Sequence, residues 1–299
     1  NKGPLIPEDS IDFIYILLGI LNSKVSHYCF KLLNPTLSLQ NGDVDKLPVI
    51  FDVGQKSFLE TLIKNNIAIA RSDWDTHENS WDFQVNSLIK QKNASIKTSF
   101  EIYQSKWKAK FYELHHSEEV LNRYFIDTYG LQNELTPDVP LEEITILKEE
   151  SKIVNGELFI EPVLVLMQLL SYSIGCIFGR YSLDKPGLIL ANQGETLQDF
   201  LKQVTNPTFK SDEDNIIPVL VGEWFSDDIV GRFKAFLKAA FGEENFEENL
   251  NYIEDTIGKD IRKYFVKDFY NDHIKRYKKR PIYWMFTSPK GHFKALIYM

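Results

Sequence analysis

An aspartate and a charged triplet that follows it are the first residues whose types and spacing could do chemistry. Asp138 is followed by Glu150, Ser151 and Lys152, which match the Asp…Glu-x-Lys pattern with which many nucleases hold a divalent metal ion. The pattern is short, and a Glu-x-Lys triplet near another acid recurs by chance in charged surface segments. The sequence therefore favours the alternative, a proline-bounded linker followed by a solvated acidic turn.

A second group of candidate metal ligands lies in a segment that also contains large aromatic residues. The potential ligands are Asp73, Asp75, His77, Glu78 and Asp82. The aromatic residues between and after them are Trp74, Trp81 and Phe83. We expect the aspartates to cap turns and helix starts and the three aromatic side chains to pack as a small core, so that the segment is structural and binds no metal.

No other residues form a catalytic pattern. The remaining histidines have no metal-ligand spacing with cysteines or acids, and no order of Ser, His and Asp indicates a triad. The glycines of Gly175-Cys176-Ile177-Phe178-Gly179 follow a helical pattern instead of a strand. They therefore indicate a helix terminus and not a cofactor-binding loop. We predict no catalytic, cofactor-binding or metal-binding residue in this chain.

Basic residues are concentrated in two segments, although the formal net charge of the chain is -8. A local positive field can bind nucleic acid whatever the net charge. The candidate DNA-binding residues are, in the first segment, Lys90, Lys92, Lys97, Tyr103, Lys106, Trp107, Lys108 and Lys110, and in the second, Lys275, Arg276, Lys278, Lys279 and Arg280. Lysines interleaved with aromatics are expected where a helix lies along a phosphate backbone. A solvated helix face, or a basic last turn that complements the helix dipole, explains the same residues without DNA.

The composition and length indicate a cytoplasmic protein with more than one compact unit. The 299 residues exceed the usual size of a single hydrophobic core. No apolar run approaches the roughly 20 residues that cross a bilayer, and no secretory signal is recognisable. Cys29 and Cys176 lie in apolar surroundings, which fits reduced thiols better than a disulfide framework.

Hydrophobic periodicity predicts a mostly α fold of the α+β class, with a helical spacer, a helical C-terminal domain and a terminal β-hairpin. Ser10 is the predicted cap of the first helix, and Ser226 is the predicted cap of a helix that ends at Phe241. Gly130 is the predicted C-cap of the helix over 118–129. The predicted helices cover residues 10–21, 22–33, 55–70, 87–116, 118–129, 162–178, a short stretch around 198, 226–241, 243–257 and 260–279. Strands are predicted at 36–40 and 144–147, and a hairpin at 282–287 and 293–298.

Several stretches resemble one family, the adenine-specific DNA methyltransferases of the BREX phage-exclusion and phage-growth-limitation systems, usually called PglX. The resembling stretches are Tyr15-Ile16-Leu17-Leu18-Gly19-Ile20-Leu21-Asn22-Ser23-Lys24, Asn34-Pro35-Thr36-Leu37, Gly42-Asp43, Leu47-Pro48, Asp73-Trp74-Asp75, Ser80-Trp81-Asp82-Phe83, Tyr129-Gly130-Leu131-Gln132, Glu134-Leu135-Thr136-Pro137, Gly175-Cys176, Phe178-Gly179-Arg180-Tyr181-Ser182-Leu183-Asp184, Asp227-Asp228-Ile229-Val230 and Lys279-Arg280-Pro281-Ile282-Tyr283-Trp284. They spread over almost the whole chain.

The resemblance implies a longer, S-adenosylmethionine-dependent parent enzyme that acts on double-stranded DNA beside other phage-defence proteins. Such an enzyme needs an (Asp/Asn/Ser)-Pro-Pro-aromatic tetrapeptide for the flipped adenine, and no Pro-Pro pair occurs here. The cofactor and the catalytic motif are therefore expected outside this chain. The first helices also resemble the end of the target-recognition domain in type I restriction specificity subunits.

By these resemblances residues 1–50 are the end of a truncated recognition domain, 51–135 a helical spacer and 136–299 a C-terminal α+β domain. The predicted function is DNA recognition and scaffolding for N6-adenine methylation. Two alternatives stay open: a protein-interaction scaffold without DNA contact, and the metal-dependent nuclease part of a fused restriction-modification enzyme. A continuous basic groove would favour the first, an exposed apolar patch the second, and convergence of Asp138, Glu150 and Lys152 the third.

Overall fold

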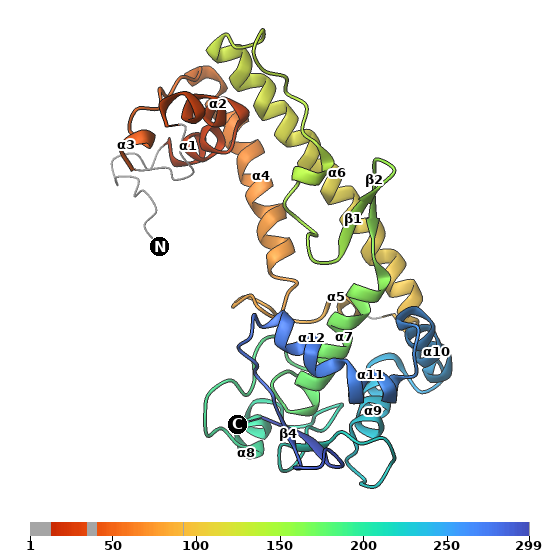
Figure 1. The fold of residues 1–299 in the computed structure, drawn as a ribbon. Helices are drawn as coiled ribbons and strands as arrows, with labels where there is room; N and C mark the ends of the chain where they lie inside the picture. Colours follow the sequence, from red (N-terminus) through yellow and green to blue (C-terminus); the bar gives the residue numbers. More distant parts are fainter. Residues whose placement is uncertain (1–12, 35–40, 92, 299) are drawn as a thin grey trace. The chain divides into compact units, whose positions relative to one another are not determined.

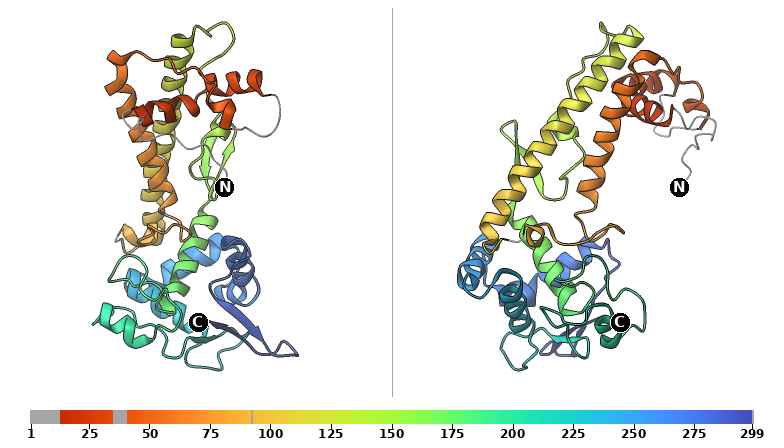
Figure 2. Two further views of the ribbon diagram at one scale, coloured as in Figure 1. Left: turned by 90° about the vertical axis from the view of Figure 1, so that its left-hand side faces the viewer. Right: turned by 180° about the vertical axis from the view of Figure 1, so that it is seen from behind.

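The computed structural model describes residues 13–34, 41–91 and 93–298, and they form a mostly α fold with two small β-sheets, as predicted. The predicted cap Ser10, the predicted strand at 36–40 and the candidate Lys92 lie outside the described residues. The chain separates into two compact units, each built from non-contiguous segments. Figures 1 and 2 show the elements of both units. The three-part division into recognition end, spacer and C-terminal domain stays a prediction.

The first unit comprises residues up to 73, 107–148 and 152–159. Its elements are α1 (Ile14–Leu21), α2 (Lys24–Leu33), α3 (Asn41–Val44), η2 (Val53–Gln55), nearly all of α4 (Lys56–Trp74), the larger part of α6 (Ile96–Tyr129) and η3 (Leu141–Glu143). The second helix, predicted over 22–33, is α2, and Ser23 caps it by accepting a hydrogen bond from the backbone N–H of Ser26. Gly130, with a φ of 66°, ends α6 as expected.

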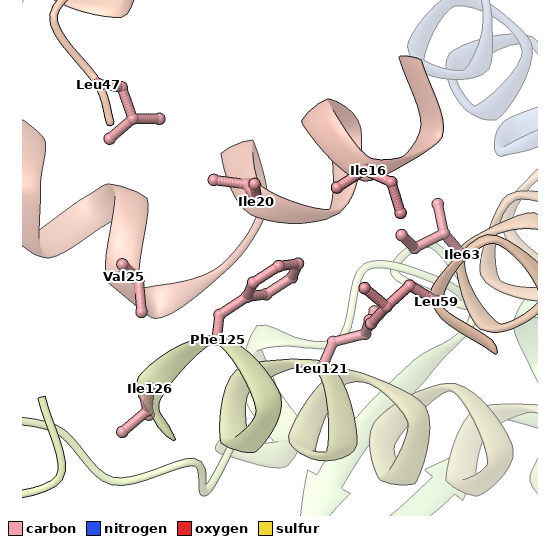
Figure 3. Close-up of a cluster of buried hydrophobic side chains, with 9 residues drawn as sticks. All are labelled: Ile16, Ile20, Val25, Leu47, Leu59, Ile63, Leu121, Phe125 and Ile126. Atoms are coloured by element: carbon pink, nitrogen blue, oxygen red, sulfur yellow. The ribbon is translucent and has the colours of Figure 1, made fainter. Parts of the chain in front are cut away.

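The core of the first unit lies where α1, α2 and α4 meet the end of α6. Its buried residues are Ile16, Ile20, Val25, Leu47, Leu59, Ile63, Leu121, Phe125 and Ile126, shown in Figure 3. Gly19 lies opposite Ile63 of α4, and a Cβ built there would come within 2.5 Å of the Ile63 side chain. The glycine in the first PglX-like stretch is therefore explained by the close approach of α1 and α4.

The predicted strand at 144–147 is wrong, because these residues follow η3 as an irregular segment and turn. Leu147 has a φ of 58°, which no strand allows. The strands are instead β1 (Ser151–Val154) and β2 (Glu157–Ile160), joined by Asn155 and Gly156. Both joining residues have positive φ, 52° and 77°, as a two-residue hairpin turn requires.

The second unit comprises residues 74–106, 149–151 and 160 onward. Its elements are α5 (Ser87–Lys90), the start of α6, α7 (Pro162–Ile177), α8 (Leu197–Gln203), β3 (Ile216–Pro218), α9 (Ile229–Phe241), α10 (Phe246–Ile257), α11 (Ile261–Lys267), α12 (Phe269–Arg276), β4 (Trp284–Thr287) and β5 (Lys294–Ile297). Helix α7 is buried along most of its length and packs against α9 and α10. The predicted helix end at Gly179 is confirmed, with a φ of 72°.

Two helix boundaries in the second unit differ from the prediction. The cap of α9 is Asp228 and not Ser226, because the Asp228 carboxylate accepts from the backbone N–H groups of Val230 and Gly231. The same carboxylate receives two hydrogen bonds from the Arg262 guanidinium, at 2.8 and 3.0 Å, which joins α9 to α11. The helix predicted over 260–279 is divided at Asp268 into α11 and α12. Conversely, the predicted break before residue 118 is absent, since α6 is continuous.

The predicted C-terminal hairpin is confirmed, and it gains a third strand. β5 pairs antiparallel with β4, with Trp284 opposite Ile297 and Phe286 opposite Ala295. On its other edge β5 pairs with β3, which places Ile216 opposite Ile297. The sheet order is therefore β3-β5-β4, and β4 is an edge strand.

Candidate nucleic-acid interface

Three consecutive basic residues follow the end of α12 and form what we call the basic turn, residues 278–280. The backbone N–H of Lys279 donates to the carbonyl of Ile274 at 2.8 Å, and that of Arg280 donates to Tyr277 at 2.9 Å. Lys278 and Lys279 both have positive φ, 50° and 66°. The three side chains of the basic turn are exposed, and none forms an ion pair with an acid of the described segments. They are thus available to an anionic ligand.

Buried and part-buried hydrogen bonds hold the basic turn on both sides. Before it, the Tyr277 hydroxyl donates to the Glu78 carboxylate at 2.7 Å, and the Asn79 amide donates to the Arg276 carbonyl at 3.1 Å. After it, the backbone N–H groups of Ile282 and Tyr283 both donate to Nε2 of His273. A fixed backbone presents charged side chains at a lower entropic cost than a mobile loop does. Lys275 is exposed, whereas Arg276 is half-buried.

The aromatic residues of the first basic segment do not belong to a DNA-facing surface, which corrects the prediction for Tyr103 and Trp107. Tyr103 is 1% exposed and Trp107 is 2% exposed. Both occur on the buried side of α6, at the spacing of one helical turn. Their periodicity is that of a core stripe, so neither ring can stack on a base in this conformation.

The lysines of α6 lie on opposite sides of that buried stripe. At about 100° per residue, Lys97 and Lys106 are about 180° apart around the helix axis, and Lys108 and Lys110 are about 160° apart. Lys110 also donates to the Ser72 hydroxyl at 2.9 Å, with its Nζ 4.9 Å from the centroid of the Trp107 ring. The segment therefore lacks the single lysine face that the sequence suggested. Lys90, at the end of α5, is exposed.

Glu150 does not occupy the exposed position that the nuclease pattern requires. Its side chain is fully buried. The Tyr103 hydroxyl donates to one carboxylate oxygen at 2.7 Å, and Nε2 of His77 lies 3.3 Å from the other. Lys152, two residues later, is exposed, with its Nζ 5.6 Å from the centroid of the Phe159 ring. The predicted acidic turn is present at 146–150, with Glu149 exposed, but Glu150 itself is not solvated. Its carboxylate is part of a buried hydrogen-bonded network, which does not favour the metal role of the alternative reading.

The expected aromatic core around residues 73–83 is only partly present. Trp81 is 97% exposed and Trp74 is also exposed, so the prediction that both are buried is wrong. Phe83 is buried against the rings of Tyr172 and Tyr181. The structural role of the aspartates is confirmed for Asp73 and Asp75. The Asp73 carboxylate accepts from the backbone N–H of Leu147, and that of Asp75 accepts from the Ser80 hydroxyl.

One acidic cluster was missed by the sequence reasoning. Asp212, Asp214 and Asp227 line a hollow of about 910 Å³ between α8 and the start of α9, and their ligand oxygens lie within 4.8 Å of one another. Burial and the neighbouring Asp214 raise the pKa of Asp212 to about 6. Arg232 lines the same hollow and partly offsets this negative charge. Since such clusters are common without an ion, we assign no metal to it. Asp227 follows Asp212 and Asp214 by thirteen positions or more. This spacing matches no metal-ligand motif, so no pattern in the sequence indicated the cluster.

Two named relatives identify what the chain is similar to. It is 35% identical, over 96% of its length, to the adenine-specific methyltransferase BrxX of Escherichia coli O9:H4 (strain HS). It is 37% identical, over 94% of its length, to the adenine-specific methyltransferase PglX of Lacticaseibacillus casei (strain Zhang). The chain is a homologue of one segment of the PglX-type methyltransferases. No family profile matches it.

The PglX-type homology covers nearly all of this chain but little of its relatives. The chain spans 25% of the length of BrxX and 23% of the length of PglX. The resemblance inferred from the residues is thereby confirmed. Among the described residues of this PglX-type segment, no helix is long and apolar enough to pass through a membrane.

Proposed function

We propose that this chain is a DNA-holding, non-catalytic segment of an N6-adenine DNA methyltransferase that serves phage defence. The observation that carries the proposal is its 35% and 37% identity, along nearly its whole length, to segments of adenine-specific methyltransferases. The basic turn supports it, since three exposed cations with no acidic partner among the described residues occur together in a chain with a net charge of -8. The structural role of this segment is to add phosphate contacts to those of a recognition domain.

The proposed contacts are electrostatic and independent of DNA sequence. Lys278, Lys279 and Arg280 would each contact a phosphate of the duplex. Lys275 lies three positions before Lys278 in the sequence. Contacts to phosphates position a protein on DNA, whereas base edges in the grooves supply specificity. The target sequence would therefore be read elsewhere in the polypeptide.

The methyl donor and the chemistry belong to another part of the same enzyme in this proposal. The present chain has no Pro-Pro pair with which to hold a flipped adenine. We accordingly propose that S-adenosylmethionine binds outside this segment. Double-stranded DNA would be its macromolecular ligand, the other phage-defence proteins its partners, and the cytoplasm its location.

A second candidate function is a protein-interaction scaffold without DNA contact. Large apolar side chains favour it, because Val221 and Trp224 are largely exposed and Phe225 is half-exposed beside Phe293. Contiguous exposed apolar residues are typical of protein interfaces. The nuclease alternative lacks such support, since Glu150 is buried.

Titration of the chain with a short duplex at several salt concentrations tests the proposed function. Phosphate contacts predict that log K falls linearly with log salt. Failure of the chain to bind duplex even at low salt would contradict the proposal and leave the scaffold as the better explanation.

A further inference from the structure

The outer face of the β3-β5-β4 sheet carries two exposed aromatic residues in alternate positions of its edge strand. Trp284 is 48% exposed and Phe286 is 52% exposed. Successive side chains of a strand point to opposite faces of the sheet. Tyr283, just before the strand, is buried, and its ring stacks on those of Phe178 and His273. The core therefore lies on one side of the sheet, and Trp284 and Phe286 are directed away from it.

Small and aliphatic residues surround the two aromatic rings on the same face. Trp284 lies opposite Ile297 of β5, and Ile297 lies opposite Ile216 of β3. Phe286 lies opposite Ala295, which is buried. The rings belong to residues two apart, roughly 7 Å along the strand. Two planar groups could thus be accommodated side by side on a largely apolar surface, which we call the outer sheet face (Trp284, Phe286, Ile297 and Ile216).

Positive charge lies close in sequence to the aromatic edge strand of this face. The basic turn, residues 278–280, ends four positions before Trp284, and its three cations have no acidic partner in the described ranges. Lys290 and His292 are exposed in the loop between β4 and β5. The nearby acid Asp214 precedes β3, at the opposite edge of the sheet. An anionic ligand would therefore be directed toward the β4 side.

We infer that the outer sheet face binds unpaired bases of single-stranded DNA. One base would stack on Trp284 and the next on Phe286, while the phosphates beside them meet the basic turn. Exposed aromatics next to unpaired cations are the combination that single-strand-binding surfaces use, because every base has a planar face and every linkage a negative charge. A protein ligand would exploit the apolar surface but would leave the three cations without a role.

This inference goes beyond the proposed function, because duplex DNA presents phosphates but no free base faces. Phosphate contacts with a duplex need the basic turn alone. Stacking of unpaired bases needs Trp284 and Phe286 as well. The two therefore make different demands on the same chain, and one set of variants separates them.

The experiment measures the affinity of the chain for a fluorescein-labelled oligothymidine of about 12 nucleotides and for a duplex of equal length. Trp284→Ala and Phe286→Ala should each weaken single-strand binding about 5- to 100-fold, as removal of one stacking platform does. Neither should change duplex binding. Trp81→Ala is the matched control, since that ring is 97% exposed and lies outside the sheet; it should change neither affinity.

Three outcomes would overturn the inference. The first is unchanged single-strand affinity in both sheet variants, and the second is no single-strand binding by the wild-type chain at low salt. The third is a self-association, seen by sedimentation, that Trp284→Ala abolishes, because the outer sheet face would then be covered by a second copy. Circular dichroism of each variant verifies that the fold is intact, which is expected because both substituted rings are half exposed.

Discussion

Nε2 of His273 accepts a hydrogen bond from the backbone N–H of Tyr283, at 3.1 Å, and a second from that of Ile282, at 3.0 Å. A ring nitrogen that accepts hydrogen bonds carries no proton, so the imidazole is neutral and its proton is on Nδ1. The ring also stacks on Tyr283, with a centroid separation of 4.8 Å. The approach to β4, and hence the exit of the basic turn, is therefore aligned by an uncharged histidine.

We predict that this anchor is lost in acid. Burial lowers the pKa of His273 from 6.5 to about 4. The unfolded chain thus takes up the proton more readily, and the stability that His273 contributes is complete above pH 6.5 and is lost as pH falls toward 4. Thermal melts between these pH values should show a loss on the order of 1 to 3 kcal/mol that His273→Gln abolishes.

The exposed His292 supplies the control for that experiment. His292→Gln should melt with the same pH profile as the wild type. Superimposable profiles for the wild type and His273→Gln would show that the histidine does not titrate as the structure requires.

The Tyr103–Glu150 hydrogen bond should stabilise the second unit. Removal of the tyrosine hydroxyl leaves a buried carboxylate oxygen short of a donor. We expect Tyr103→Phe to lower the free energy of unfolding by roughly 1 to 3 kcal/mol. Tyr270→Phe is the control, because that half-buried hydroxyl has no hydrogen bond to a described residue. Equal stability of the two variants in urea denaturation would refute the assignment.

Asp212 should have the opposite pH dependence to His273. Its folded pKa of about 6 lies above its usual value of 3.8, so its favourable contribution is complete below pH 4 and is lost as pH rises through 6. Asp212→Asn should therefore raise the free energy of unfolding at pH 7.5, on the order of 1 to 2 kcal/mol, and leave it unchanged near pH 4. Asp255→Asn, at an exposed site, should have no such effect. A destabilised Asp212→Asn at pH 7.5 would mean that the ionised cluster is needed, as it would be for a bound cation.

Local signals predicted much of the helical fold. The break between the first two helices, the helix that starts at Pro162, the end of α6 at Gly130 and the C-terminal hairpin all depend on residues near one another in sequence. The hairpin at Asn155-Gly156 was equally readable, because Asn-Gly between two short apolar runs favours a two-residue turn. It was missed because the acids before it were interpreted as a solvated turn.

Long-range contacts were not predictable in the same way. β3 has three residues and forms only because Ile217 pairs with Leu296, far along the chain. For Glu150 and Trp81 in the candidate site, burial likewise depends on distant parts of the chain and could not be predicted from their neighbours in the sequence. Burial of the carboxylate depends on Tyr103 and His77, distant partners that no local pattern identifies. Trp81 was expected inside because it is large and aromatic, yet no element of its unit covers it.

The most direct test of the account is the salt dependence of duplex binding by the wild type and two triple variants. Lys278→Gln, Lys279→Gln and Arg280→Gln together should reduce the slope of log K against log salt by up to about three units, roughly one for each phosphate that is no longer neutralised. Lys106→Gln, Lys108→Gln and Lys110→Gln together should reduce it by about one unit or less, because Lys108 lies on the other side of the helix from Lys106 and Lys110, and Lys110 is already bonded to Ser72. A control with Lys31, Lys46 and Lys185 neutralised has the same change in net charge at exposed sites outside both segments. Only the basic-turn variant should depart strongly from the wild type; equal slopes for that variant and the control would contradict phosphate binding by the basic turn.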